Sequence, residues 1–427
     1  MIPEKAFERL LGLDDCWEVA GAEYETDPQE RFLLVVRETD KLWSRLVCPL
    51  PTCRCSRVVC HDHTEPRTWR HLDAFGKPTE ILCAPPRGRC GECRHVWRVP
   101  LPWEGEGKHF TRDFEAFALT LMREMPMKKA GEILGEHDTR LWRMLFAHVD
   151  KAYAELDLSE LMHLGVDEMS SRKGHHYLTV FADLIARRVV YATEGKDHTT
   201  FERFAEEILR HNGHPKAIEA VAMDMSKAYQ KGAREELGNA KVVFDPFHVT
   251  ALVSEAVDQV RRAEAAGGET EAKSALRKSI YLFRKNPENL SEKESERLEE
   301  LDLKHLATGQ AYMMRLELRD IYQRTSDPGR ARYRLTNWLN WVRAKCERFG
   351  EWLKPMVKVA DTIEKHMGGI LAHWSGELST AYLEGLNSVF SAVKRKARGY
   401  RSSEYMITML YFVAGKLKLP SYSSHRK

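Results

Sequence analysis

The stretch from residue 161 to residue 248 constrains the fold most, because strand-like and helix-like patterns alternate there in one order. Three β-rich runs come first, and each later run follows a helical pattern. The expected strands are 161–169, 175–184, 187–195, 217–225 and 241–248, and the expected helices are 201–213 and 227–238. Right-handed crossovers would bring the later strands alongside the first in a mixed sheet. We therefore expect an α/β fold in which the first and fourth strands are neighbours at the centre of a five-stranded sheet.

Two aspartates occupy positions of interest in this sheet. Asp167 lies in the first strand and Asp224 at the C-terminal end of the fourth, so the strand order would bring them together. The chain has 63 acidic residues, and one at a strand end would be weak evidence without this order. Carboxylate ligands suit Mg²⁺, and two such ions can stabilise the attacking and leaving oxygens of a phosphoryl displacement. The pattern predicts a metal site for phosphoryl transfer.

A third acidic residue is expected in a helix over 380–400. Its apolar stripe, at helical spacing, is Leu383, Leu386, Phe390 and Val393. Glu384 and Asn387 share the opposite face, next to a basic run. The cations expected to contact DNA phosphates are Lys394, Arg395, Lys396, Arg398 and Arg401. An acid close to cations is what a site acting on a phosphate polymer needs, since the cations position the backbone.

The cysteines are concentrated near the start of the chain, where eight of the nine precede residue 94. Without a secretion signal, this usage favours metal binding over disulfides. Cys90 and Cys93 form a C-x-x-C pair, and Cys48 would complete the set with either Cys53 or Cys55. Four thiolates in a tetrahedron are a structural Zn²⁺ site. We expect a small zinc-ribbon-like module.

Residues 127–150 have the pattern of two helices separated by a turn at Gly135. In a helix-turn-helix the second helix enters the major groove, and Thr139, Arg140 and Arg143 would face DNA. A plain helical hairpin that links two domains fits the pattern equally well. The N-terminus lacks the features of a secretion signal, and no apolar run reaches the length of a membrane span. We expect a cytoplasmic protein.

Several motifs, taken together and in order, resemble a known family. GVDEMS, AMDMSKAY, FDPFHV and YLEGLNSVFSAVKRKARGY resemble the catalytic signatures of DDE transposases of bacterial insertion sequences. The cysteine module with RHLDAFG, PPRGRC and VPLPW resembles the ISL-three (ISL3-like) branch in particular. The likeness extends over residues 45 to 415.

This resemblance implies a ribonuclease-H-like catalytic core and assigns roles by position. The catalytic residues that hold two Mg²⁺ ions, with Mn²⁺ as a substitute, would be Asp167, Asp224 and Glu384. The zinc ligands would be Cys48, Cys53, Cys90 and Cys93, although the wide first pair leaves Cys55 open. Asp245 and His248 would lie near the site, as would Asn387; on residues alone, His248 could equally begin a helix.

The implied activity is that of a transposase which binds terminal inverted repeats, hydrolyses a phosphodiester at each end and joins the freed 3′-hydroxyl to target DNA. Its partner would be double-stranded DNA in the bacterial nucleoid. Because two ends are cut together, a homodimer is expected. Two alternatives remain: a catalytically silent DNA-binding regulator derived from a transposase, and a metal-dependent nuclease without strand transfer.

The expected organisation has six parts. They are an N-terminal segment (1–44), a zinc-binding DNA-recognition domain (45–103), a helix-turn-helix domain (108–155), the first part of the catalytic core (158–255), an all-helical insertion (256–375) and the second part of the core with the basic C-terminal region (376–427).

Overall fold

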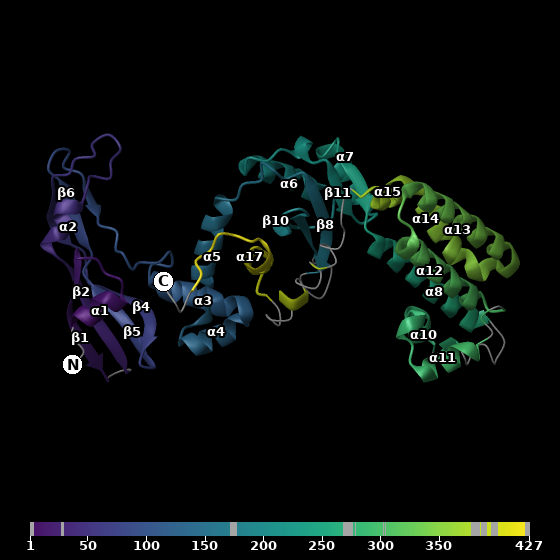
Figure 1. The fold of residues 1–427 in the computed structure, drawn as a ribbon, viewed down its shortest axis with the longest axis horizontal. Helices are drawn as coiled ribbons and strands as arrows, with labels where there is room; N and C mark the ends of the chain where they lie inside the picture. Colours follow the sequence, from purple (N-terminus) through teal and green to yellow (C-terminus); the bar gives the residue numbers. More distant parts are fainter. Residues whose placement is uncertain are drawn as a thin grey trace. The chain divides into compact units, whose positions relative to one another are not determined.

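The computed structural model of the chain describes residues 4–26, 30–170, 177–267, 276–277, 279–301, 303, 305–376, 385, 391–393 and 400–422. It divides into two compact units, one of Met1–Glu155 with Leu417–Lys427 and one of Leu156–Lys416 (Figure 1). Among the helices in these ranges, none has both the length and the apolar character needed to cross a membrane.

The first unit begins with a four-stranded sheet in the order β1-β2-β5-β4. The strands are β1 (Trp17–Glu25), β2 (Arg31–Glu38), β4 (Arg67–Ala74) and β5 (Lys77–Cys83), with helices α1 (Glu4–Leu10) and α2 (Asp40–Arg45) beside them. β2 and β5 pair in parallel, and the other two pairs are antiparallel. The segment expected to stand apart at 1–44 therefore shares one sheet with strands from the region expected as the zinc-binding domain.

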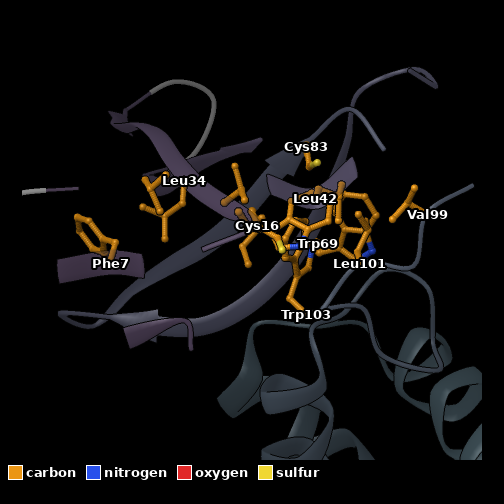
Figure 2. Packing of buried hydrophobic residues seen from close by; sticks show 13 residues of the cluster. Phe7, Cys16, Leu34, Leu42, Trp69, Cys83, Val99, Leu101 and Trp103 are labelled. Atoms are coloured by element: carbon orange, nitrogen blue, oxygen red, sulfur yellow. The ribbon is translucent and has the colours of Figure 1, made fainter. Parts of the chain in front are cut away.

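A core rich in tryptophan packs against this sheet (Figure 2). Trp103 lies edge-on to Trp17 and Trp69, with ring centroids 5.1 and 6.1 Å apart. Val99 and Leu101 are buried in the same cluster. The VPLPW segment has the composition of a boundary, yet its apolar side chains complete the core of the first sheet.

A second, three-stranded sheet in the order β3-β6-β7 carries the cysteine module. Its strands are β3 (Val58–His63), β6 (Pro86–Cys90) and β7 (Val96–Arg98), all antiparallel. β3 contains a register shift between Cys60 and Asp62, so that His61 is an extra residue opposite β6. A bulge of this kind changes the face on which the following side chains lie.

The helical part of the first unit contains α3 (Arg112–Glu124), α4 (Met127–Leu134) and α5 (Asp138–Ala154). Gly135 ends α4 in the left-handed conformation, with φ of 66°, which glycine adopts without a steric cost. Glu115 of α3 is 1% exposed, and its Oε2 lies 2.8 Å from Nε2 of the buried His148 on α5. Glu115 also accepts hydrogen bonds from the backbone amides of Glu106 and Gly107, at 2.9 and 2.6 Å. This carboxylate thus ties two helices and the preceding loop together.

The second unit is built on a five-stranded mixed sheet in the order β10-β9-β8-β11-β12. The strands are β8 (His163–Ser170), β9 (Tyr177–Asp183), β10 (Arg188–Glu194), β11 (Ala220–Met223) and β12 (Lys241–Phe244). The first three pair antiparallel, whereas β11 is parallel to both β8 and β12. The expectation that the first and fourth strands of this region are neighbours is confirmed.

Two helices follow the crossover pattern of this sheet, α6 (Thr199–Arg210) and α7 (Lys227–Glu236), with a short 3₁₀ turn η1 (Pro215–Ala217). The ring of Phe181 on β9 stacks on Phe204 of α6 with centroids 4.4 Å apart. Gly232 of α7 lies against Phe201, and a Cβ there would be 2.6 Å from that ring. α6 and α7 therefore pack closely enough to fix the chain that leaves β11.

Helices dominate the rest of this unit. They are α8 (Pro246–Gly267), α10 (Ile280–Arg284), η2 (Pro287–Asn289), α11 (Glu292–Glu299), α12 (Ala307–Arg324), α13 (Pro328–Phe349), η3 (Gly350–Leu353), α14 (Lys354–Lys365), α15 (Met367–Leu371), η4 (Ala372–Ser375) and α17 (Ser403–Ala414). Glu264 of α8 accepts bonds from the amides of Ala307 and Thr308, both at 2.8 Å, and so caps α12. Trp338 is buried and its indole donates a hydrogen bond to the Met314 carbonyl, so it belongs to the core of this helical part.

Candidate active site and DNA-binding elements

Three aspartates lie level with one another at one edge of the five-stranded sheet. The parallel register pairs Ala222 with Gly165, and Asp224 and Asp167 each lie two residues further along their chains. Met223 pairs with Phe244, so Asp224 and Asp245 each follow by one residue. The register therefore brings these three residues from distant parts of the sequence to the same end of the sheet.

Each aspartate is oriented by a backbone amide close to it in the sequence. The Oδ1 atoms of Asp167, Asp224 and Asp245 accept hydrogen bonds from the amides of Glu168, Ser226 and Phe247, at 2.7, 2.8 and 2.9 Å. The bonds of Asp224 and Asp245 stabilise the turns that lead into α7 and α8, as short acidic side chains commonly do. The start of the following helix therefore positions Asp224 and Asp245, whereas Asp167 is held within β8.

His248 on the first turn of α8 approaches this edge. Its Nε2 lies 3.8 Å from Oδ1 of Asp167, and its side chain is 33% exposed against 12% for Asp167. The sequence left open whether this histidine begins a helix or lies near the site. It does both, because the turn after Asp245 aims it at the first aspartate.

Glu168 lies beside Asp167 on β8. Burial raises its pKa, and the charges of Asp224 and Asp167 raise it further, while Lys196 and His248 act in the opposite direction. The environment of Glu168 therefore includes two of the aspartates and two basic side chains.

Tyr229 is a residue near the site to which the sequence pattern assigned no role. It is 1% exposed and its hydroxyl lies 2.9 Å from Oγ1 of Thr179 on β9. Burial raises its pKa well above the usual range, and Asp224, Glu168 and Asp167 add to this effect. The AMDMSKAY motif contains both Asp224 and Tyr229, and this nearness in sequence was the available signal.

The remaining expected members of this site lie outside the described residues. These are Glu384, Asn387, Lys394, Arg395, Lys396 and Arg398. Arg401 is described and exposed, just before α17. That helix packs on β10 of the same unit, where the Tyr411 hydroxyl accepts a hydrogen bond from the Ala192 amide at 3.1 Å.

The cysteine module brings four sulfur atoms together. The sulfurs of Cys48 and Cys93 lie 3.6 Å apart, those of Cys53 and Cys90 lie 3.7 Å apart, and all four fall within 4.8 Å of one another. Cys55 is not in this group, and its sulfur accepts a hydrogen bond from the Arg57 amide instead. Burial disfavours the Cys90 thiolate, but backbone amides of Cys93 and Glu92 outweigh it and lower the pKa of Cys90 to about 6. The donor set and spacing suit a tetrahedral zinc ion.

The three residues expected to face DNA lie at the start of α5. Arg143 is exposed, whereas Arg140 forms an ion pair with Glu136 at 2.6 Å and lies over the Phe110 ring. Thr139 is hydrogen-bonded to His137 at the helix start. Arg143 is therefore more accessible to a nucleic-acid partner than Arg140.

Comparisons with known proteins agree with this arrangement. A family model described as a transposase, of the ISL3 DDE type, matches residues 164–410, and a model described as the helix-turn-helix domain of transposase family ISL3 matches residues 99–149. The transposase for insertion sequence element IS1001 of Bordetella parapertussis is 28% identical over 414 residues, which cover 95% of this chain and 97% of that protein. The transposase for insertion sequence element IS1557 of Mycobacterium tuberculosis is 26% identical over 461 residues, covering 99% of this chain and 98% of that protein.

Proposed function

This chain belongs to the ISL3 family of transposases, and we propose that it binds the terminal inverted repeats of an insertion sequence and catalyses Mg²⁺-dependent DNA cleavage and strand transfer. The observation that carries the proposal is the level position of Asp167 and Asp224 on adjacent parallel strands. The mixed strand order around them supports a ribonuclease-H-like core. Glu384 is the third carboxylate that we propose.

The donor set fits a hard divalent cation. Asp167 and Asp224 supply carboxylate oxygens at the same end of the sheet, and the pKa of Glu168 beside them is raised by burial and then by the charges of these two aspartates. Asp167 and Asp224, with Glu384, would hold Mg²⁺ or Mn²⁺. When bound, two such ions would stabilise the attacking and leaving oxygens of the phosphodiester.

The proposed reaction has two steps, hydrolysis and strand transfer. Water attacks the phosphorus at the end of the element, the bond to the 3′ oxygen breaks, and that oxygen leaves as a hydroxyl. The hydroxyl then attacks a target phosphodiester, forms a new phosphorus–oxygen bond and releases the target 3′-hydroxyl. The described residues contribute by orientation, since the turns after Asp224 and Asp245 fix their carboxylates and His248 faces Asp167.

DNA recognition is assigned to the first unit and the basic C-terminal run. α5 would enter a major groove through Thr139 and Arg143, while Arg140 would first have to leave Glu136. The basic run around Arg401 would contact phosphates, so binding would weaken steeply with salt. Cutting two ends in concert would require a dimer.

The cysteine cluster is proposed to hold a structural zinc ion. Cys53→Ser is expected to release this zinc and to weaken DNA binding, because a module this small depends on its metal to fold. Cys55→Ser is the matched control, since its sulfur lies outside the four-sulfur group. Equal zinc loss in both variants would contradict the assignment.

The decisive experiment is a cleavage and joining assay on labelled DNA from the flanks of the protein's own gene, comparing the wild type with Asp224→Ala in Mg²⁺. The proposal expects metal-dependent nicks at repeat boundaries and joined products, both absent from the variant. Nicks without joining would favour a nuclease. Specific binding without cutting in either protein would favour a regulator.

A further inference from the structure

A second group of metal-binding side chains lies in the first unit, away from the four cysteines. The ligand atoms of Glu38, Cys60 and His63 all fall within 4.8 Å of one another. His63 Nε2 is 2.7 Å from Glu38 Oε1. Glu38 ends β2, whereas Cys60 and His63 lie on β3, and these two strands belong to different sheets.

The bulge in β3 creates this grouping. Side chains three residues apart on a regular strand point to opposite faces. Cys60 lies opposite Gly88 and His63 lies opposite Pro86, so the extra residue His61 restores an even spacing and puts both side chains on one face. Asp62 between them forms an ion pair with Arg87 on the neighbouring strand. The bulge therefore places the side chains of Cys60 and His63 on the same face of β3, where both could bind one ion.

Glu38 gives the grouping its charge. Its side chain is only 13% exposed, whereas that of His63 is 42% exposed. A carboxylate so far removed from water requires a positive partner, and a histidine supplies one only while it is protonated. A divalent cation bound to Glu38 and to the neutral imidazole would supply that positive charge without a proton on the histidine.

From this geometry we infer that Glu38, Cys60 and His63 form a second zinc site, which fastens the sheet of the cysteine module to the N-terminal sheet. One sulfur, one nitrogen and one oxygen ligand match the donors that zinc accepts, and water would complete the tetrahedron. Ligand atoms bound to one zinc ion lie about 3.3–3.6 Å apart, so His63 and Glu38 need to separate by only about half an ångström. The site would fix the orientation of the two sheets of the first unit.

The test is the zinc content of the purified full-length protein after dialysis against metal-free buffer. His63→Ala and the isosteric Glu38→Gln are each expected to remove one equivalent of zinc per chain and to keep the equivalent held by the four cysteines. Cys53→Ser is expected to remove both equivalents, because β3 belongs to the module that this variant unfolds. His61→Ala is the matched control, because this exposed imidazole lies on the same strand but outside the group. Its zinc content should equal that of the wild type.

Two equivalents of zinc in the wild type and one in His63→Ala and in Glu38→Gln support a second site. Zinc content in His63→Ala and Glu38→Gln equal to the wild type overturns the inference, as does an equal loss in His61→Ala. Since the equivalent that stays in His63→Ala reports on the four cysteines, failure of one assignment is distinguishable from failure of the other.

Discussion

Acidic side chains of the two units have different surroundings. In the first unit, Glu115 is buried, and His148 and two backbone amides supply its hydrogen bonds. In the second, Asp167, Asp224 and Asp245 lie at the same end of the sheet, where burial raises the pKa of Glu168 and the charges of Asp224 and Asp167 raise it further. The hydrogen bonds of Glu115 join two helices and a loop, which indicates a role in stability. The proposed role of Asp167 and Asp224 is instead to hold a metal ion.

The largest effect is expected from removing one charge at the sheet edge. Asp224→Asn keeps an oxygen that can accept the Ser226 amide, so the turn into α7 should survive. Loss of the charge should lower the cleavage rate by about 10³-fold or more, as for other preorganised electrostatic groups. The midpoint of thermal unfolding should stay equal or rise, because a like-charge repulsion is removed. Activity within tenfold of the wild type would show that Asp224 is not part of the active site.

The opposite pattern is expected at Glu115. Glu115→Ala leaves His148 and two amides without their buried partner, which should cost about 3–5 kcal/mol of unfolding free energy. Urea unfolding followed by tryptophan fluorescence measures this cost, since three tryptophans pack in the core of the same unit. Glu115→Gln should lose less, because an amide oxygen remains. A cost below 1 kcal/mol for the alanine variant would remove the distinction between the two groups.

A cation should stabilise only one of the two regions. Ligand that binds the folded state alone adds about 2.7 kcal/mol at one hundred times its dissociation constant. Mg²⁺ is therefore expected to raise the unfolding midpoint of the wild type and of Glu115→Gln, but not that of Asp224→Asn. Differential scanning calorimetry at increasing Mg²⁺ gives the comparison, with Na⁺ at matched ionic strength as the control. An equal rise in all three proteins would mean that the ion acts elsewhere.

The sheet edge could be predicted from the sequence, whereas the Glu115 pair could not. Crossover handedness and strand order are enough to put Asp224 beside Asp167, since both follow from local patterns. Glu115 and His148 look like ordinary polar positions on amphipathic helices, and they are 33 residues apart. Only the packing of α3 on α5 removes both from water.

Local sequence patterns were also insufficient for the cysteines and for the tryptophan-rich core of the first unit. Spacing alone could not separate Cys53 from Cys55, because the choice depends on how the chain turns before β3, where Cys55 accepts from the Arg57 amide. Trp103 follows two prolines in a segment with the composition of a boundary. Its burial arises from Trp17 and Trp69, which are distant in sequence and invisible to any local pattern.

The smallest effect is expected from Glu168→Gln, whose thermal midpoint is compared with that of the wild type at two pH values. Because burial raises the pKa of Glu168 in the folded chain, the fold binds this proton more tightly than the unfolded chain does. The stability that Glu168 contributes is therefore present below the ordinary carboxyl pKa and is lost as the pH rises through the raised value. Removing the charge should raise the thermal midpoint by about 1 °C at pH 7, a change typical of a partly exposed position, and leave it equal to the wild type at pH 4. A midpoint at pH 7 lower than that of the wild type would mean that the charged form of Glu168 is stabilised by partners within the protein, as we expect for Glu115. The charges of Asp167 and Asp224 would then not destabilise it.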